Sequence, residues 1–188
     1  MSNLLKISKK YKEEADRILI NTGLTDSLKK YGEVNYTGAF AGDVMMHGDI
    51  DIAVVREAPY SLEEIFIIFK EIYFERKFKC YFLDGDWNNP KKGKDFPDGY
   101  YIGLKDVIDN EKWKFDIWFI SREEFNKRSN LLSIDKVQLT EDQKERILLF
   151  KQYRKDNMLD INGQSIYKAV LEGDCKSIES LKSYLNLI

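Results

Sequence analysis

Apolar residues recur every three or four positions near both ends of the chain, a spacing that predicts amphipathic helices. Capping boxes, in which Ser or Thr is followed three residues later by Glu or Gln, mark the points where helices open. Such boxes begin at Ser61, Ser121 and Thr140. Together the two signals predict helices over residues 4–20, 24–30, 61–75, 140–156, 163–171 and 175–187.

In the middle of the chain apolar and polar residues alternate, which is the period of a half-buried β-strand. The predicted strands are residues 33–39, 49–55, 79–83, 100–107 and 112–120, the last two joined as a hairpin at Asp109-Asn110. Because helices and strands mix without strict alternation, the predicted fold class is α+β, a mixed β-sheet with flanking helices and a C-terminal helical segment. The best boundary lies between residues 121 and 140, which divides the chain into a core of residues 1–120 and a helical segment of residues 121–188.

The composition is that of an ordinary globular protein. Of 188 residues, 43% are hydrophobic and 33% are charged, which excludes a disordered chain. The net charge of −2 excludes recruitment of nucleic acid by bulk electrostatics. No apolar run suits a membrane span or a signal peptide. Cys80 and Cys175 lie too far apart in sequence to form a metal-binding pair, so they are predicted to be buried thiols in a reducing compartment. These features predict a cytoplasmic protein with no membrane partner.

Two acids one residue apart interrupt an apolar run in Asp49-Ile50-Asp51-Ile52. On a strand, alternate side chains point the same way, so Asp49 and Asp51 share one face, roughly 6–7 Å apart along the strand. The isoleucines point the other way, into a core. Two neighbouring carboxylates repel each other, and a divalent cation relieves that repulsion. The strand is therefore predicted to be half core and half metal site.

A third acid, Asp116, stands alone in the apolar strand Lys-Trp-Lys-Phe-Asp-Ile-Trp-Phe-Ile of residues 112–120. A buried carboxylate without a partner is costly, so Asp116 should have one. If this strand lies beside residues 49–55, Asp116 completes a cluster of three carboxylates, which suits Mg²⁺ or Mn²⁺ rather than zinc. The alternative is an ion pair between Asp116 and Lys114 on a solvated sheet face.

This pattern resembles the nucleotidyltransferase superfamily related to DNA polymerase beta. A strand ends in a glycine and a small residue, acid-apolar-acid-apolar follows about ten residues later, and a later strand supplies a third acid. The matching residues are Gly38, Ala39, Asp49, Asp51 and Asp116, and the likeness covers roughly residues 33–120. The resemblance implies a nucleotidyltransferase-like core for the α+β fold.

The resemblance also implies a mechanism. Asp49 and Asp51 would hold two Mg²⁺ or Mn²⁺ ions that bridge the triphosphate of an NTP. Asp116 would help to bind the catalytic metal and draw the proton from the acceptor hydroxyl. The backbone of Gly38 and Ala39 would face the phosphates. An NMP group would pass to a hydroxyl-bearing acceptor with release of pyrophosphate, and the acceptor is expected to be a small molecule rather than a protein or RNA.

Two features depart from the family pattern. Ala39 stands where Ser or a second Gly is usual, and the loop after it has Gly42-Asp43 where an arginine is often found. They motivate an alternative in which the chain is a catalytically degenerate binding or regulatory module, as in a toxin–antitoxin pair. A third interpretation treats Asp49 and Asp51 as the metal pair of a nucleotide-sugar glycosyltransferase. The short chain and the Gly38-Ala39 turn count against it.

Other polar residues yield weaker predictions. His47, the only histidine, is expected to be a solvated loop residue that could touch a phosphate. The loop of residues 84–100 resembles the start of a calcium loop, but its spacing fails, and its lysines are expected to be solvated. Tyr100, Tyr101 and Lys105 are candidates for lining an acceptor pocket, and Trp118 for a wall of the site.

Overall fold

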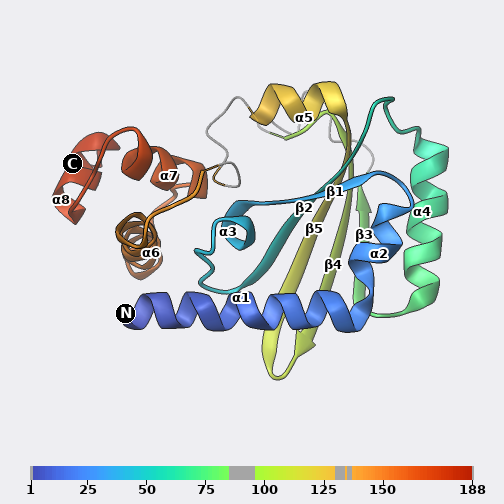
Figure 1. Cartoon of the computed structure of the whole chain (residues 1–188), viewed down its shortest axis with the longest axis horizontal. Helices are drawn as coiled ribbons and strands as arrows, with labels where there is room; N and C mark the ends of the chain where they lie inside the picture. The colour runs from blue at the N-terminus through green and yellow to red at the C-terminus, as the bar shows by residue number, and fades with distance from the viewer. Residues whose placement is uncertain (1, 85–95, 130–133, 135–136, 188) are drawn as a thin grey trace.

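The protein is built on a five-stranded mixed sheet (Figure 1). The computed structural model describes residues 2–84, 96–129, 134 and 137–187. The strand order is β1-β2-β5-β4-β3, in which β2 and β5 run parallel and the other neighbours run antiparallel. The strands are β1 Glu33–Thr37, β2 Gly48–Arg56, β3 Cys80–Asp84, β4 Gly99–Ile108 and β5 Glu111–Ser121. The predicted α+β class with a mixed sheet is confirmed.

One face of the sheet is buried and the other carries polar side chains. Along β5, Phe115 and Ile117 are fully buried, whereas Lys114 and Asp116, which alternate with them, are partly exposed. The predicted hairpin joins β4 to β5, with positive φ at Asp109 and Asn110, as a two-residue hairpin turn requires. The alternation seen in the sequence thus corresponds to a core face and an open face.

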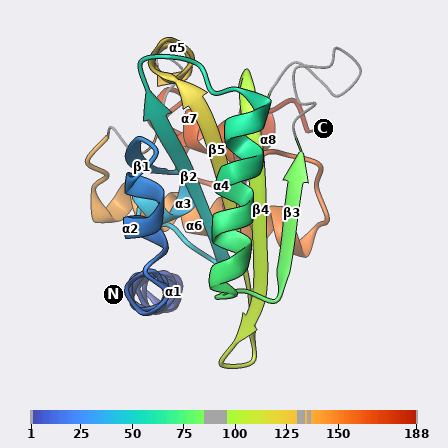
Figure 2. The same ribbon diagram turned by 90° about the vertical axis from the view of Figure 1, so that its right-hand side faces the viewer.

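Three helices cover the buried face: α1 Asn3–Thr22, α2 Leu24–Lys29 and α4 Leu62–Glu75. Figure 2 shows α2 and α4 in front of the sheet, with α7 and α8 behind it. The apolar stripes of these helices pack on β2 and β5 in one core cluster. The capping box predicted at Ser61 is present and fixes the start of α4.

The C-terminal helices form a second cluster on the opposite side of the sheet (Figure 1). These are α6 Glu141–Asp156, α7 Gly163–Leu171 and α8 Ile178–Tyr184. The short helix α5 Arg122–Ser129 contacts β2 and β5 and lies over the ends of the strands (Figure 1). The N-terminal end of α1 contributes Leu5 to this second cluster. The predicted boundary between residues 121 and 140 stays a prediction.

Two predicted elements need correction. The strand predicted to reach residue 39 ends at Thr37, because Gly38 adopts φ +62° and turns the chain into the short helix α3 Gly38–Ala41. The helix predicted over residues 175–187 begins only at Ile178, because the hydroxyl of Ser177 accepts a hydrogen bond from the Ser180 backbone and caps it.

Within the described residues, no helix combines the length and apolarity that crossing a bilayer would demand. Most of the loop predicted after β3, including the lysines at 91, 92 and 94, lies outside the described residues.

Candidate active site

Three acids meet on the open face of the sheet. Asp49 and Asp51 lie on β2, and Asp116 lies on β5 directly opposite Asp51 in the parallel register. One carboxylate oxygen from each residue lies within 4.8 Å of the other two. The predicted convergence of the three carboxylates is therefore present, and it follows from the parallel pairing of β2 with β5.

The three carboxylates repel one another across the paired strands β2 and β5. Their burial adds to the free-energy cost of charging them. Burial, followed by the charges of Asp49 and Asp116, raises the pKa of Asp51 to about 7. Burial also raises the pKa of Asp49, against the lowering effect of nearby Lys114. The Oδ1 atom of Asp49 is buried and has no hydrogen-bond partner in the described part of the chain. A hard divalent cation would satisfy this oxygen and cancel the repulsion, so the donor set fits Mg²⁺ or Mn²⁺.

Gly38 lies against the acids and must be glycine for two reasons. Its φ of +62° is in the left-handed region, and a Cβ atom there would lie 2.2 Å from Oδ2 of Asp51. Its neighbour Ala39 lines a cavity of 370 Å³ that also contains Asp49. The structure thus places Gly38 and Ala39 beside the acids, whereas their part in phosphate binding stays a prediction.

Asp116 also has two partners of its own on the open face. The hydroxyl of Tyr101 donates a hydrogen bond of 2.5 Å to Oδ1, and the ammonium of Lys114 contacts Oδ2. A Cβ atom on Gly103 would lie 2.6 Å from the Tyr101 hydroxyl, so the glycine leaves the room that this hydrogen bond needs. The ion pair with Lys114, which the sequence offered as an alternative to the acid cluster, therefore coexists with that cluster.

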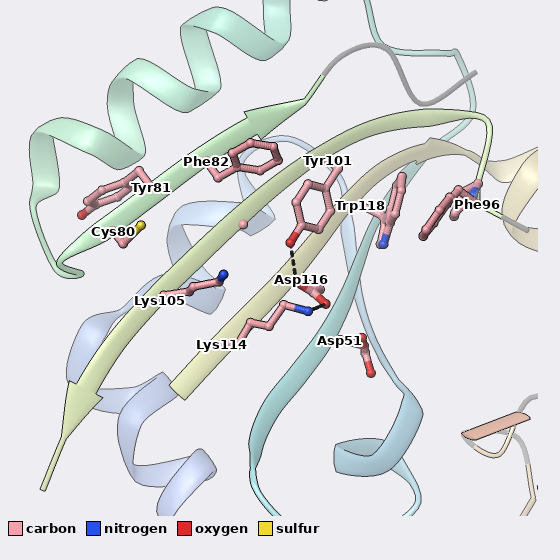
Figure 3. Close-up of a pocket in the computed structure, with 12 residues that line it drawn as sticks. Asp51, Cys80, Tyr81, Phe82, Phe96, Tyr101, Lys105, Lys114, Asp116 and Trp118 are labelled. Atoms are coloured by element: carbon pink, nitrogen blue, oxygen red, sulfur yellow. Dashed lines mark hydrogen bonds and ion pairs between the residues drawn. The ribbon is translucent and has the colours of Figure 1, made fainter. Parts of the chain in front are cut away.

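A cavity of 690 Å³ opens next to Asp116 on the sheet face (Figure 3). Aromatic rings and two lysines dominate its walls. Tyr101 and Trp118 pack with their ring centroids 5.2 Å apart, and Phe82 is half exposed beside Tyr101. The lining residues are Asp51, Cys80, Tyr81, Phe82, Phe96, Pro97, Tyr101, Gly103, Lys105, Lys114, Asp116 and Trp118. The predictions that Tyr101, Lys105 and Trp118 line a pocket near the site are confirmed. The prediction for Tyr100 is wrong, because alternation along β4 turns its ring to the other face, where it packs against the core.

The 370 Å³ cavity on the other side of Asp49 is basic. Helix α6 contributes Lys151, Arg154 and Lys155 to its wall, and His47 faces it from the loop before β2. Lys151 is buried and donates a 2.9 Å hydrogen bond to the Val44 carbonyl. Burial lowers the pKa of Lys151 to about 8, although the charges of Asp51 and Asp49 oppose this.

Sequence reasoning missed these α6 residues. The basic positions 151, 154 and 155 share one side of a helix. That spacing was the only available signal, and basic residues at a helix C-terminus are ordinary because they complement the helix dipole. His47 was expected in solvent. The structure confirms this, because its side chain is exposed where it borders the basic cavity. Desolvation there lowers its pKa despite the opposing charge of Asp49.

No protein-family model matches the chain, and no curated protein matches it in sequence. Solved structures do match. A cytoplasmic RNA terminal U-transferase superposes with a TM-score of 0.51 at 16% identity, covering 91% of this chain and 48% of that one. Cid1, described by its RNA terminal uridylyl transferase activity, gives 0.50 at 18%, covering 82% and 43%. The poly(A) polymerase complex GLD-2 – GLD-3 gives 0.54 at 10%, covering 97% and 63%.

These three proteins are members of the nucleotidyltransferase superfamily, so the chain has a nucleotidyltransferase-like fold, as the sequence resemblance predicts. The fold leaves the glycosyltransferase interpretation without support. The chain spans between 43% and 63% of the length of the matching chains.

Proposed function

We propose that the protein is a metal-dependent nucleotidyltransferase that moves an NMP group from an NTP to a hydroxyl-bearing acceptor and releases pyrophosphate. The observation that carries this proposal is the convergence of Asp49, Asp51 and Asp116 on the open face of a nucleotidyltransferase-like fold. The three acids would hold Mg²⁺ or Mn²⁺, and their unsatisfied buried oxygen supports that role. When bound, the metal supplies positive charge to the transferring phosphoryl group and to the acceptor oxygen.

The basic cavity beside Asp49 is the proposed site of the NTP triphosphate. Its positive side chains face the acids across 370 Å³ of space, so an anion bound there would lie between α6 and the acid cluster. The side chain of Lys155 is exposed and has no hydrogen bond or ion pair among the described residues, which leaves its ammonium available to a phosphate. The backbone of Gly38 and Ala39 would close the opposite edge of the site.

The cavity beside Asp116 is the proposed acceptor site. Asp116 lines it and would take the proton from the acceptor hydroxyl. The rings of Tyr101 and Trp118 and the ammonium groups of Lys105 and Lys114 suit a ligand that combines a planar base with negative charge. This lining supports the end of an RNA strand over the small molecule that the sequence favours. Two of the similar structures are of RNA terminal uridylyl transferases.

The cytoplasm is the proposed location. Both cysteines are free thiols, which is typical of a reducing compartment. Cys175 is buried as predicted, whereas Cys80 is exposed, so the prediction of a buried thiol is wrong there.

The test is transfer of labelled nucleotide in the presence of Mg²⁺, with each NTP and a panel of short RNAs and small hydroxylated molecules. We expect labelled product with the wild type and a loss of at least about a thousandfold with Asp51→Asn, since a metal ligand is removed. Asp26→Asn, which alters an exposed acid on α2 far from the cluster in sequence, is the matched control. Transfer that survives Asp51→Asn contradicts the proposal.

A second candidate is a catalytically degenerate module that binds or regulates a partner. Ala39 in place of Ser favours it, because the hydroxyl that would contact a phosphate is missing, and so does the absence of an arginine in the loop that follows. Calorimetry with Mg²⁺ and each NTP separates the two. Tight NTP binding that depends on metal argues against the degenerate module, and its absence together with absent transfer argues for it.

A further inference from the structure

Asp116 enters the acid cluster with both carboxylate oxygens already engaged. Tyr101 holds Oδ1 through its hydroxyl, and Lys114 holds Oδ2 through its ammonium. In Figure 3, Tyr101 reaches Asp116 from β4 and Lys114 reaches it along β5, and all three residues line the 690 Å³ cavity. If Asp116 serves as a metal ligand, at least one of these two contacts must break when the ion binds.

Lys114 is placed to neutralise the whole cluster. In the parallel register it lies directly opposite Asp49, and it is two residues before Asp116 on the same face of β5. Its ammonium contacts Oδ2 of Asp116, and one oxygen of each acid lies within 4.8 Å of the other two. The positive charge of the lysine therefore lies beside three groups that would otherwise repel one another.

The other nearby lysines lack this relation to the acids. Lys151 donates a hydrogen bond to the carbonyl of Val44 and forms none with an acid among the described residues. Lys105 lies directly opposite Lys114 across β4 and β5, in the same cavity, and forms no ion pair among the residues that the structure describes. Two like charges directly opposite on neighbouring strands are unfavourable unless one of them is compensated, and Asp116 compensates Lys114.

We propose that Lys114 is an internal counter-ion that takes the place of the metal at Asp116, and that a divalent cation displaces its ammonium when it binds the acids. The displaced ammonium then points into the acceptor cavity, where it is free to meet a negative charge. Binding of metal would in this way prepare the cavity for an anionic acceptor. The inference rests on the metal site of the proposed function and is independent of whether transfer occurs.

The test measures Mn²⁺ binding directly, by the electron paramagnetic resonance signal of free Mn²⁺, in the full chain. Lys114→Met keeps the apolar stem and removes the charge. We expect it to bind Mn²⁺ roughly fivefold more tightly than the wild type, because the ion no longer competes with a partly exposed ion pair. In EDTA the same variant should melt at a lower temperature than the wild type, and Mn²⁺ should raise its melting temperature by more.

Lys105→Met is the matched control, since it removes the same charge from the opposite strand but breaks no contact with an acid. We expect its Mn²⁺ affinity to stay within about twofold of the wild type. Lys114→Gln serves as a second variant if the methionine perturbs folding. Affinities that are unchanged in the Lys114 variants, or raised equally by Lys105→Met, overturn the counter-ion proposal.

Asp116→Asn separates this result from the fate of the proposed function. If Asp116→Asn binds Mn²⁺ as well as the wild type does, then the metal site itself is wrong, and both proposals fall. If Asp116→Asn loses the ion while Lys114→Met gains no affinity, then only the role of Lys114 is overturned.

Discussion

Gly38 and Gly23 share a backbone conformation but differ in their surroundings, and the pair isolates the effect of the active site on a single residue. Their φ values are +62° and +63°, yet a Cβ atom at Gly23 meets nothing within 4 Å, whereas one at Gly38 meets Oδ2 of Asp51. We expect Gly23→Ala and Gly38→Ala each to lower the free energy of unfolding by about 1–2 kcal/mol through backbone strain. Only Gly38→Ala should also reduce the stabilisation by Mg²⁺, because Asp51 must move.

Urea denaturation with and without Mg²⁺ measures both effects. An equal response of the two variants to Mg²⁺ would show that Gly38 is required for its backbone conformation alone.

The raised pKa of Asp51 makes the stability of the metal-free protein depend on pH. This pKa is about 7 in the folded protein against an ordinary value of 3.8, so the folded state keeps a proton that the unfolded chain releases. The stabilisation is complete below the ordinary pKa and is lost as the pH rises toward 7. In EDTA we expect the free energy of unfolding to fall by a few kcal/mol (order of magnitude) relative to Asp51→Asn over this range.

Denaturation curves at several pH values check this prediction. Saturating Mg²⁺ should remove most of this decrease in the free energy of unfolding, because the cation stabilises the charged carboxylate. Parallel pH profiles for the wild type and Asp51→Asn would contradict it.

At the scale of an element, helix α6 supplies the positive charge of the cavity beside Asp49. Lys151 is fixed on the Val44 carbonyl and Arg154 on the Ile161 carbonyl, whereas Lys155 stays exposed on the cavity wall. We expect Lys155→Ala to weaken NTP binding roughly tenfold, the loss of one charge-assisted hydrogen bond to a phosphate. Calorimetry measures the change, and Lys10→Ala on the exposed side of α1 is the control. Equal affinities for the two variants would place the triphosphate elsewhere.

Elements with a strong periodic signal were predictable from the sequence. The helix of residues 163–171 and the β4–β5 hairpin correspond closely to the predicted ones, because apolar spacing and turn residues depend on neighbours along the chain. The short helix α3 was not predictable. It exists because Gly38 turns the chain past Asp51, a contact between β1 and β2 that no local pattern contains.

The same distinction applies to the site. Asp49 and Asp51 are recognisable from alternation on a single strand, and Asp116 is recognisable as a lone acid in an apolar strand. The α6 residues and the aromatic cavity depend on how distant segments pack, so their place at the site could not be derived from spacing. Neither could the simultaneous contacts of Asp116 with Lys114 and with the acid cluster, which the sequence presented as alternatives.

At the scale of the whole molecule, one helix joins the sheet cluster and the C-terminal cluster. The N-terminal part of α1 places Leu5 in the C-terminal cluster, and its later turns place Ala15 and Ile18 in the sheet cluster. The loop before β2 does the same, since Val44 belongs to the C-terminal cluster and Met45 to the sheet cluster. We propose on this basis that residues 1–120 and 121–188 unfold as one cooperative unit.

Phe150→Ala tests this cooperativity. Phe150 is fully buried in the C-terminal cluster, so its truncation should cost about 3–5 kcal/mol. The tryptophans stand at positions 87, 113 and 118, within the first 120 residues, so their fluorescence reports on that part of the chain. If α1 couples the clusters, Phe150→Ala lowers the unfolding midpoints from fluorescence and from circular dichroism together. The control Phe115→Ala, in the sheet cluster, should also lower both midpoints together. A fluorescence midpoint that stays at the wild-type value while circular dichroism shows two steps would mean that the helical segment unfolds separately. The basic wall of the triphosphate cavity would then be held against the acids only by local contacts.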